Sequence, residues 1–331
     1  MTRTLRVLLV SYSGRFAGME HRMLDEAKIL QSRGAHVAAA TRSFPERYLF
    51  ERELERLNVP IYSFDPPRFL SDWSRRYIHL LRLRLEFRKY AWLKDFDVIR
   101  IFMPWANRGL EHLYIASKVG IPSIVSVHNS FGTETIRTPW HDRFLPKAFQ
   151  NVAGAYGISQ AALDNFLRRF QCYIDNRTKF TVIPNGVDTK IYYPRAEAPS
   201  SLRSQLGLST ETRIIGCVGR LSAHKRPQYV IDVFSEVVQK LGQRCHLIFV
   251  GEGELRNQVH AKVQKDNLGD KITIYGYADN VAEIMAGLDV HVLLSQVEGF
   301  GQVNAEAMAS GVPTVASDVP DRKSTRLNSS H

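Results

Sequence analysis

Short apolar runs rich in β-branched residues alternate with longer segments of helical period, and this alternation constrains the fold more than any other feature. The strand-like runs of the first half are Arg6–Ser11, Ala35–Thr41, Ile61–Phe64, Val98–Phe102, Ser123–Val127 and Gly154–Ile158. Between them, Met19–Arg33 and Leu110–Val119 show helical spacing, and Gly34 and Gly120 follow as C-terminal caps. This order favours a parallel sheet with helices on both faces.

The alternation restarts beyond the turn Pro184-Asn185-Gly186 and a linker-like stretch at 194–210, so the 331 residues fit two domains. The second set of strand-like runs is Ile214–Val218, His246–Val250, Ile272–Tyr275, Val290–Leu294 and Thr314–Ala316. The helical segments between them are Arg226–Leu241, Glu254–Asp266, Asn280–Ala286 and Gln302–Ser310. We predict an N-terminal domain over residues 1–183, a C-terminal domain over 184–321 and a separate polar tail over 322–331.

The formal net charge of +11 lies entirely in the first predicted domain, which indicates an anionic partner for that half. Nucleic acid, an anionic membrane and a phosphorylated substrate are the candidates. The aromatic segment Trp73–Trp92 carries several of the basic side chains, among them Arg75, Arg76, Arg82 and Arg84. Such a segment can lie on an anionic membrane surface. A surface helix with a solvated basic face fits slightly better, because apolar residues lie nearly all round it.

Several protein classes are disfavoured by the absence of their patterns. Cys172, Cys217 and Cys245 are far apart and odd in number, which argues against a disulfide framework or a zinc site and favours a reducing compartment. The sequence contains no apolar run of about 20 residues, no Gly-x-Ser-x-Gly elbow and no Gly-x-Gly-x-x-Gly loop after the first strand. We expect no metal, no nucleic-acid partner, and a cytoplasmic protein that is at most peripheral on the inner face of a membrane.

The stretch from Ser295 to Pro313 is the most informative one chemically. A glycine-rich loop follows a strand there, and a helix begins near Gly301. Free amides and the helix dipole at such a site favour phosphate. Glu298 in the loop and Glu306 in the helix are suited to accept hydrogen bonds from hydroxyls of a sugar or ribose. The alternative is that each glutamate is simply a solvated surface residue.

A second stretch, from Gly216 to Pro227, presents cations at the end of a strand. Gly219 and Arg220 end the strand, and Lys225 lies five residues further on. Arginine and lysine that reach one crevice form a clamp for a pyrophosphate. The alternative is two unrelated surface cations. His224, beside Lys225, is expected to be an exposed loop residue.

Together these motifs resemble the family 4 glycosyltransferases of the GT-B fold. The matching residues are Gly219-Arg220-Leu221 with Lys225, Val250-Gly-Glu-Gly253, Glu298-Gly-Phe-Gly301, Glu306-Ala-Met-Ala309, Gly311, Pro313 and Ile183-Pro-Asn-Gly-Val-Asp188. The resemblance covers residues from about 5 to 318 and is most specific between 182 and 316. It implies an α/β GT-B architecture, in which two Rossmann-like domains face each other across a cleft.

The resemblance also implies roles for individual residues. Arg220 and Lys225 are expected to hold the donor pyrophosphate, and Glu306 the ribose of the nucleotide. Glu298 and His128 are the expected catalytic residues, facing the transferred sugar. The expected donor-binding backbone groups belong to Phe300, Gly301 and, in a loop after the first strand, Gly18. As a lone histidine after a strand, His128 is equally consistent with a residue of the core.

The function implied is transfer of a sugar, with retention and without a metal, from a nucleotide-diphosphate sugar to a glycan or lipid-linked acceptor in polysaccharide synthesis. No cofactor is expected besides the donor substrate. Three alternatives remain open: another GT-B enzyme such as a nucleotide-sugar epimerase, a membrane-surface binding fragment built on residues 73–92, and an inactive fragment.

The sequence departs from the family pattern in three places. The usual paired glycine is Ala17-Gly18 here, and Leu294 stands where a proline is common. The family continues beyond Asp318, whereas the tail Arg322–His331 resembles translated sequencing-adapter material. We therefore expect an incomplete second domain, and a 331-residue chain that is poorly soluble or inactive.

Overall fold

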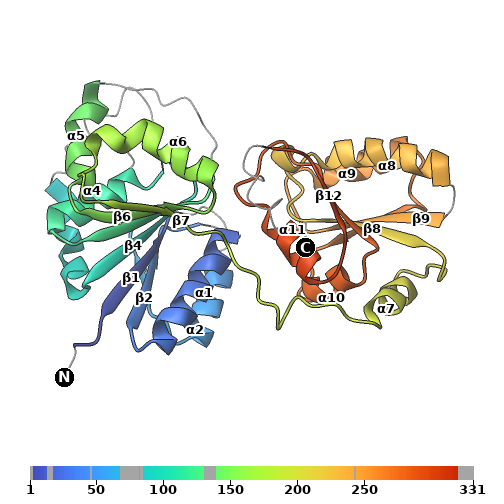
Figure 1. Cartoon of the computed structure of the whole chain (residues 1–331), viewed down its shortest axis with the longest axis horizontal. Coiled ribbons are helices and arrows are strands. Elements are labelled where there is room, and N and C mark those ends of the chain that lie inside the picture. Colours follow the sequence, from blue (N-terminus) through green and yellow to red (C-terminus); the bar gives the residue numbers. More distant parts are fainter. Residues whose placement is uncertain are drawn as a thin grey trace. The chain divides into compact units, whose positions relative to one another are not determined.

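The computed structural model describes residues 3–12, 18–44, 47–67, 82, 85–106, 108–129, 139–241 and 244–319, of which 139–143 by the backbone alone. Contacts within the chain divide it into two compact units, Met1–Asn185 and Gly186–His331. Each unit is an α/β structure built on one parallel sheet (Figure 1). The predicted fold class of two Rossmann-like units is confirmed.

The first unit contains a seven-stranded sheet in the order β3-β2-β1-β4-β5-β6-β7. Its strands are β1 (Arg6–Ser11), β2 (His36–Thr41), β3 (Ile61–Ser63), β4 (Val98–Met103), β5 (Ser123–Val127), β6 (Val152–Gly157) and β7 (Lys179–Val182). Every pair of neighbouring strands is parallel. Because β4 pairs with β1 and not with β3, the chain reverses its direction of growth between β1 and β4.

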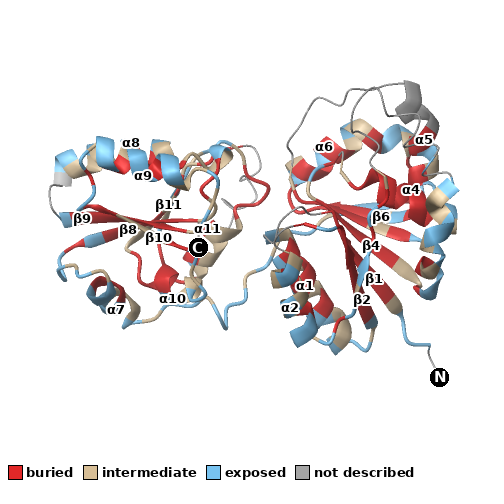
Figure 2. Ribbon diagram, turned by 180° about the vertical axis from the view of Figure 1, so that it is seen from behind, coloured by how far each residue is buried: buried red, intermediate tan, exposed pale blue. Residues whose placement is uncertain are grey.

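Helices cover both faces of this sheet, and Figure 1 shows α1 and α2 on the face opposite to α4, α5 and α6. Their bounds are α1 (Gly18–Ser32), α2 (Arg47–Arg56), α4 (Leu110–Val119), α5 (Pro139–Phe149) and α6 (Gln160–Phe170). Alternate residues of β1 serve the two faces: Val7 and Leu9 join one apolar core, and Leu8 and Val10 the other. In Figure 2 the buried residues follow the strands and the helix surfaces that face them.

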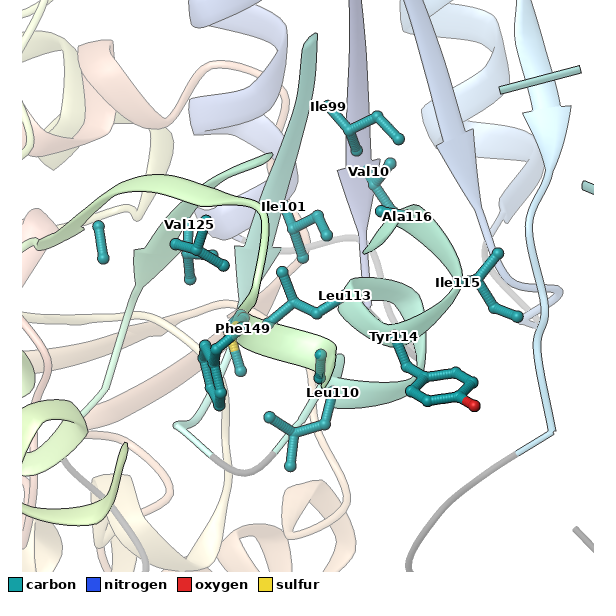
Figure 3. Close-up of a cluster of buried hydrophobic side chains, with 14 of the residues drawn as sticks. Val10, Ile99, Ile101, Leu110, Leu113, Tyr114, Ile115, Ala116, Val125 and Phe149 are labelled. Atoms are coloured by element: carbon teal, nitrogen blue, oxygen red, sulfur yellow. The ribbon is translucent and has the colours of Figure 1, made fainter. Parts of the chain in front are cut away.

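Helix α4 shows how sequence and packing combine. Gly120 ends the helix in the left-handed conformation, with a φ of 91°, as its predicted capping role requires. Leu110 and Leu113 extend from α4 into the cluster that includes Ile101 of β4 and Phe149 of α5 (Figure 3). Burying one such side chain contributes about 1.5–3 kcal/mol relative to leaving it exposed.

The second unit contains a five-stranded sheet in the order β10-β9-β8-β11-β12. Its strands are β8 (Arg213–Val218), β9 (Cys245–Val250), β10 (Ile272–Gly276), β11 (Val290–Leu293) and β12 (Thr314–Ala316). Its helices are α7 (Ala198–Gln205), α8 (Pro227–Leu241), α9 (Arg256–Lys265), α10 (Val281–Ala286) and α11 (Gln302–Ala309). Residues of α8 and α9 pack on one face of the sheet, and those of α7, α10 and α11 on the other.

The strand order places the carboxyl ends of β8 and β11 next to each other. These strands pair in parallel, with His291 opposite Gly216. They are also the point where the direction of sheet growth reverses. In open α/β sheets, ligands bind at the carboxyl ends of the strands at such a switch point. The loops that follow β8 and β11 are those that carry the predicted donor-binding residues.

The structure describes the predicted basic helix 73–92 only at residue 82 and from residue 85 onward. Within the basic segment 73–92, the residues from Phe87 onward begin a 3₁₀ helix, Phe87–Asp95, which is broken by a non-helical φ/ψ at Tyr90. Leu93 is buried, and Trp92 packs flat on Tyr62 with the ring centres 4.8 Å apart. At this end of the segment, an aromatic residue therefore docks it on the edge strand β3.

Candidate donor site

The loops after β8 and β11 contact each other directly through hydrogen bonds. The Gln296 amide donates to the carbonyl of His224 over 2.8 Å. The Lys225 Nζ donates to the Glu298 Oε1 over 2.6 Å, although the two residues are 73 positions apart. The Glu298 side chain is 9% exposed and that of Lys225 is 18% exposed. This short and largely buried ion pair holds Lys225 beside Glu298. The sequence predicted that Lys225 binds the pyrophosphate and that Glu298 binds the sugar.

Arg220 supplies a second cation to the same cluster. Its side chain is half-buried, and within the described residues no ion pair or side-chain hydrogen bond engages its guanidinium. Burial lowers the pKa of the nearby His224, and the charges of Lys225 and Arg220 lower it further, while Glu298 and Glu254 act in the opposite direction. His224 is thus neutral at pH 7. The cations of this edge of the sheet are Arg220 and Lys225.

His224 corrects one expectation from the sequence. It is half-buried, and not an exposed loop residue. Its Nδ1 lies 3.1 Å from the Ser222 Oγ, and its carbonyl accepts the hydrogen bond from Gln296. The residue therefore belongs to the connection between the two loops, which local sequence pattern alone does not reveal.

Helix α11 provides the second half of the site. Gly301 precedes the helix in the left-handed conformation, with a φ of 75°, and no side chain caps the first turn. The first amides of a helix lack intrahelical partners, and the helix dipole makes that end positive. Phe300 and Gly301 are both buried, so their backbone lines the start of the helix rather than a solvated loop. The arrangement suits an anion.

Glu306 lies in the middle of α11 and is partly buried. Burial raises the pKa of its carboxyl, and hydrogen bonds from the Gln302 amide and the Tyr192 hydroxyl partly offset this. Glu306 forms no ion pair within the part of the chain that the structure describes. A carboxylate without a cation partner keeps its acceptor capacity for hydroxyl donors.

Two glycines allow the loops after β8 and β9 to approach each other. A Cβ on Gly251 would lie 2.2 Å from the carbonyl oxygen of Gly219, and one on Gly253 would lie 2.3 Å from that of Leu221. Gly251 also has a φ of 134°, which other residues rarely adopt. The two glycines of the Val-Gly-Glu-Gly motif therefore permit the loop after β9 to pack closely against the loop that carries Arg220.

Substituting Gly251 by alanine should move this loop. We expect Gly251→Ala to lower the free energy of unfolding by about 1–3 kcal/mol, the scale of a strained backbone position. It should also weaken the binding of a nucleoside diphosphate, the ligand that the sequence motifs predict, through displacement of Arg220. Urea unfolding and calorimetric titration with UDP measure the two effects. The matched control is Gly269→Ala, where the new Cβ meets only the Gln264 amide at 3.7 Å; equal behaviour of the two variants would contradict the packing role.

The structure places the two remaining predicted residues in the first unit. His128 follows β5, is buried, and its Nε2 lies 2.7 Å from the Ser126 Oγ. Burial, together with the charges of Arg100 and Arg22, lowers its pKa to about 3. The imidazole is therefore neutral at pH 7 and able to form hydrogen bonds without carrying charge. Gly18 is the exposed first residue of α1, with open space where a Cβ would be.

Tyr192 is a neighbour of Glu306 that sequence reasoning missed. It lies four residues after Asp188, the last residue of the recognised Pro-Asn-Gly-Val-Asp motif, and burial together with the Glu306 charge raises the pKa of its phenol. In the sequence this motif indicates a turn and forms part of the family resemblance, and neither feature points to Tyr192. The position of a tyrosine so close to the motif was the one sequence signal for it. Because Glu306 lies 114 residues further along the chain, the sequence does not indicate that the two are neighbours.

Two other expectations concern metal and membrane contacts. The described residues include no group of three His, Cys, Asp or Glu side chains placed to bind a metal ion, and no helix long and apolar enough to cross a bilayer. Of the basic residues predicted to contact an anionic membrane, Arg75, Arg76 and Arg84 lie outside the described residues, as does the tail 322–331. Arg82 is exposed and paired with Glu86.

Two parallel α/β sheets, with a phosphate-favouring loop at one switch point, agree with the class that the motifs of the sequence resemble. Comparison with known families supports this class directly. Residues 16–191 match the model described as Glycosyltransferase Family 4, and residues 200–325 match that described as Glycosyl transferases group 1. The chain belongs to glycosyltransferase family 4, as its motifs predicted.

Curated relatives are similar over part of their length. The putative glycosyltransferase EpsF of Bacillus subtilis is 27% identical over 54% of this chain and 47% of its own. A UDP-Gal:alpha-D-GlcNAc-diphosphoundecaprenol alpha-1,3-galactosyltransferase of Escherichia coli is 30% identical over 65% of this chain and 56% of its own. The chain spans about half the length of the curated relatives that it matches.

Solved structures share the fold. HepE of Anabaena, in complex with UDP and glucose, is 22% identical and superposes with a TM-score of 0.72, over 98% of this chain and 83% of HepE. A glycosyltransferase of Rickettsia africae is 16% identical with a TM-score of 0.75, over 98% and 82% of the two chains. At these identities the likeness establishes the GT-B fold alone.

Proposed function

We propose that this protein transfers a sugar from a nucleoside-diphosphate sugar to a glycan or lipid-linked acceptor. The Lys225–Glu298 pair is the observation that carries the proposal. It sets a cation and a carboxylate side by side at the carboxyl ends of adjacent strands, next to the start of helix α11. A nucleoside-diphosphate sugar carries the two complementary groups next to each other. Its anionic diphosphate suits the cation, and the hydroxyls of its hexose can donate hydrogen bonds to the carboxylate.

The donor is held by the second unit in this proposal. Arg220, Lys225 and the first amides of α11 bind the diphosphate, and Glu306 accepts hydrogen bonds from the ribose. Glu298 binds hydroxyls of the transferred sugar. When the bond from the anomeric carbon to the diphosphate breaks, charge develops on the leaving oxygen. Two preorganised cations stabilise that charge, which is the work a divalent ion performs in other transferases. The transfer therefore needs no metal.

The acceptor class follows from the relatives. The Escherichia coli relative is named for a diphosphoundecaprenol-linked acceptor, and a Rhizobium meliloti relative, LpsB, for lipopolysaccharide core synthesis. An acceptor of this kind carries phosphate or lies at a membrane, and the +11 charge of the chain suits either. We infer polysaccharide or glycolipid synthesis with retention at the anomeric carbon. The cytoplasmic, membrane-peripheral location stays a prediction.

Nucleotide binding tests the proposal. We expect UDP, GDP or ADP to bind the 331-residue chain, and Glu306→Gln to weaken the binding by about 1–3 kcal/mol, since the ribose loses charge-assisted hydrogen bonds. Isothermal titration measures the affinity, and a panel of nucleotide sugars with and without a lipid-linked acceptor measures release of the diphosphate. Release that requires no acceptor would favour a nucleotide-sugar epimerase. Unchanged affinity of Glu306→Gln for all three nucleotides contradicts the assigned role.

A further inference from the structure

The first unit has a switch point of its own, which the proposed donor site does not use. Strand β4 pairs with one side of β1, while β2 and β3 lie on the other side, so the direction of sheet growth reverses between β1 and β4 (Figure 1). Ligands of open α/β sheets bind at the carboxyl ends of the strands at such a point. The loop that follows β4 and begins at Pro104 is therefore the expected position of a second ligand.

This loop leaves a tryptophan exposed while the backbone around it is held in place. Trp105 is 37% exposed, whereas its neighbour Ala106 is buried in the core of the unit. The Asn129 Nδ2, in the segment after β5, donates to the Pro104 carbonyl over 3.1 Å. The Arg108 amide donates to the Trp105 carbonyl over 3.0 Å. The indole ring therefore stands on a fixed backbone.

Arg108 places a cation beside this ring. Its guanidinium carbon lies 5.8 Å from the centre of the Trp105 ring. Within the part of the chain that the structure describes, no ion pair or hydrogen bond engages the guanidinium. Glu111, the carboxylate on which the Arg108 charge acts, has the Arg42 Nη1 at 4.0 Å. An exposed aromatic ring and a cation without a close counter-ion thus lie together at the end of β4.

We propose that Trp105 and Arg108 form an acceptor subsite for a phosphorylated sugar, in which the Trp105 ring packs on the C–H face of the sugar and Arg108 binds the phosphate. Ligand sites combine aromatic surface with a few polar groups that fix orientation. Arginine suits phosphate because its planar fork donates two parallel hydrogen bonds. The positive charge of the first half of the chain favours the same ligand. The inference rests on the proposed sugar transfer and names what the first unit recognises in the acceptor.

The probes are the 1-phosphates of N-acetylglucosamine, glucose and mannose, titrated by calorimetry into the 331-residue chain with the donor site filled by UDP. We expect at least one sugar phosphate to bind more tightly than the same free sugar and than inorganic phosphate. Arg108→Met should weaken its binding about 10- to 100-fold, the scale of hydrogen bonds to a charged group, and change that of the free sugar little. Trp105→Ala should weaken both about 3- to 10-fold, the scale of an aromatic contact.

Trp105→Phe keeps an aromatic ring and should keep most of the affinity. It should also remove most of the change in tryptophan fluorescence that the sugar phosphate causes in the wild-type chain. Tyr193→Ala is the matched control, because Tyr193 is 44% exposed and the Arg195 guanidinium carbon lies 4.7 Å from its ring centre. Arg195 is already engaged by Glu283, at 3.6 Å, so this pair offers no free cation. Its substitution should leave binding of the sugar phosphate unchanged.

Unchanged affinity of both Trp105→Ala and Arg108→Met overturns the proposal. An equal loss in Trp105→Phe and Trp105→Ala also overturns it, because Trp105 then acts only through the shape of the loop. If thermal unfolding shows that Trp105→Ala does not fold, the fluorescence of Trp105→Phe and the affinity of Arg108→Met decide.

A titration without UDP separates this inference from the proposed function. Binding of a sugar phosphate that depends on Trp105, in a chain that binds no nucleotide, refutes the donor site and leaves the subsite. Nucleotide binding without binding of any sugar phosphate refutes the subsite alone. The same sugar joined through a diphosphate to a short polyprenyl chain distinguishes the two sources of the ligand: tighter binding of this probe indicates a lipid-linked acceptor, and equal binding a free sugar phosphate.

Discussion

Lys225→Ala is expected to reduce the affinity for UDP by about 100-fold or more and to change that for uridine little. The Nζ of Lys225 forms a 2.6 Å pair with Glu298, whose side chain is 9% exposed. Loss of the lysine removes a phosphate ligand and also leaves a buried carboxylate without its cation, next to the position proposed for the diphosphate. Truncating one partner of a buried charge pair at a binding site costs about 2–5 kcal/mol of binding free energy, and the partial exposure of Lys225 places this loss toward the lower figure.

The comparison of UDP with uridine isolates the phosphates, because both ligands carry the same ribose and base. Lys262→Ala is the matched control: Lys262 pairs with Asp232 and Asp266 in the same unit but on α9. A double variant, Lys225→Met with Glu298→Gln, removes both charges. It should recover stability in thermal unfolding and still bind UDP weakly. Equal losses for UDP and uridine would point to misfolding and contradict the role of Lys225 as a phosphate ligand.

Arg100→Met is expected to lower the free energy of unfolding by about 3–5 kcal/mol. Arg100 is 6% exposed in the middle of β4, and its Nε lies 3.2 Å from the Glu26 Oε2 of α1. Its guanidinium carbon also lies 4.4 Å from the ring centre of Phe102 and 4.5 Å from that of Tyr156. Methionine keeps much of the volume, so the loss reports the removal of one cation from Glu26; the Arg22 Nε, 3.1 Å from the Glu26 Oε1, remains and places the loss toward the lower figure. Urea unfolding measures it.

The same pair predicts a pH dependence. Burial raises the pKa of Glu26, but the Arg100 charge, the Tyr156 hydroxyl and Arg22 outweigh it, so the folded pKa lies below its ordinary value. A lowered folded pKa contributes stability that is present above the unfolded pKa of about 4.3 and is lost as the pH falls through the folded value. Wild-type stability should therefore fall below about pH 4.

In Arg100→Met this acid-induced loss should shrink, because the carboxylate is no longer stabilised by its main partner. The double variant Arg100→Met with Glu26→Gln should recover part of the stability, while Arg82→Met, which breaks the exposed pair with Glu86, should change it by less than about 1 kcal/mol. A loss for Arg100→Met no larger than for Arg82→Met would show that the buried pair contributes nothing.

The alternation of strand and helix patterns in the sequence was sufficient to predict the two α/β units. Strand and helix periods and glycine caps depend on residues that are near one another in the chain. Gly120, for example, caps α4 as its position predicted. The sequence likewise predicted Glu298 in a loop and Glu306 in the next helix, because the loop and the helix are consecutive in the chain. Arg100 shows the limit: it lies inside an apolar run that reads as a buried strand, and nothing local indicates what compensates its charge.

Only the tertiary structure decided which distant side chains meet. Pairing of β11 with β8 brings Glu298 to Lys225, and packing of α1 on the sheet brings Glu26 to Arg100. Strand order and helix docking are set by burial of whole apolar faces, which is non-directional and summed over many residues. A polar pair is then selected by its position on those faces. The sequence by itself therefore determined the elements and the motifs, and the packing determined the contacts that set the charge state of each site residue.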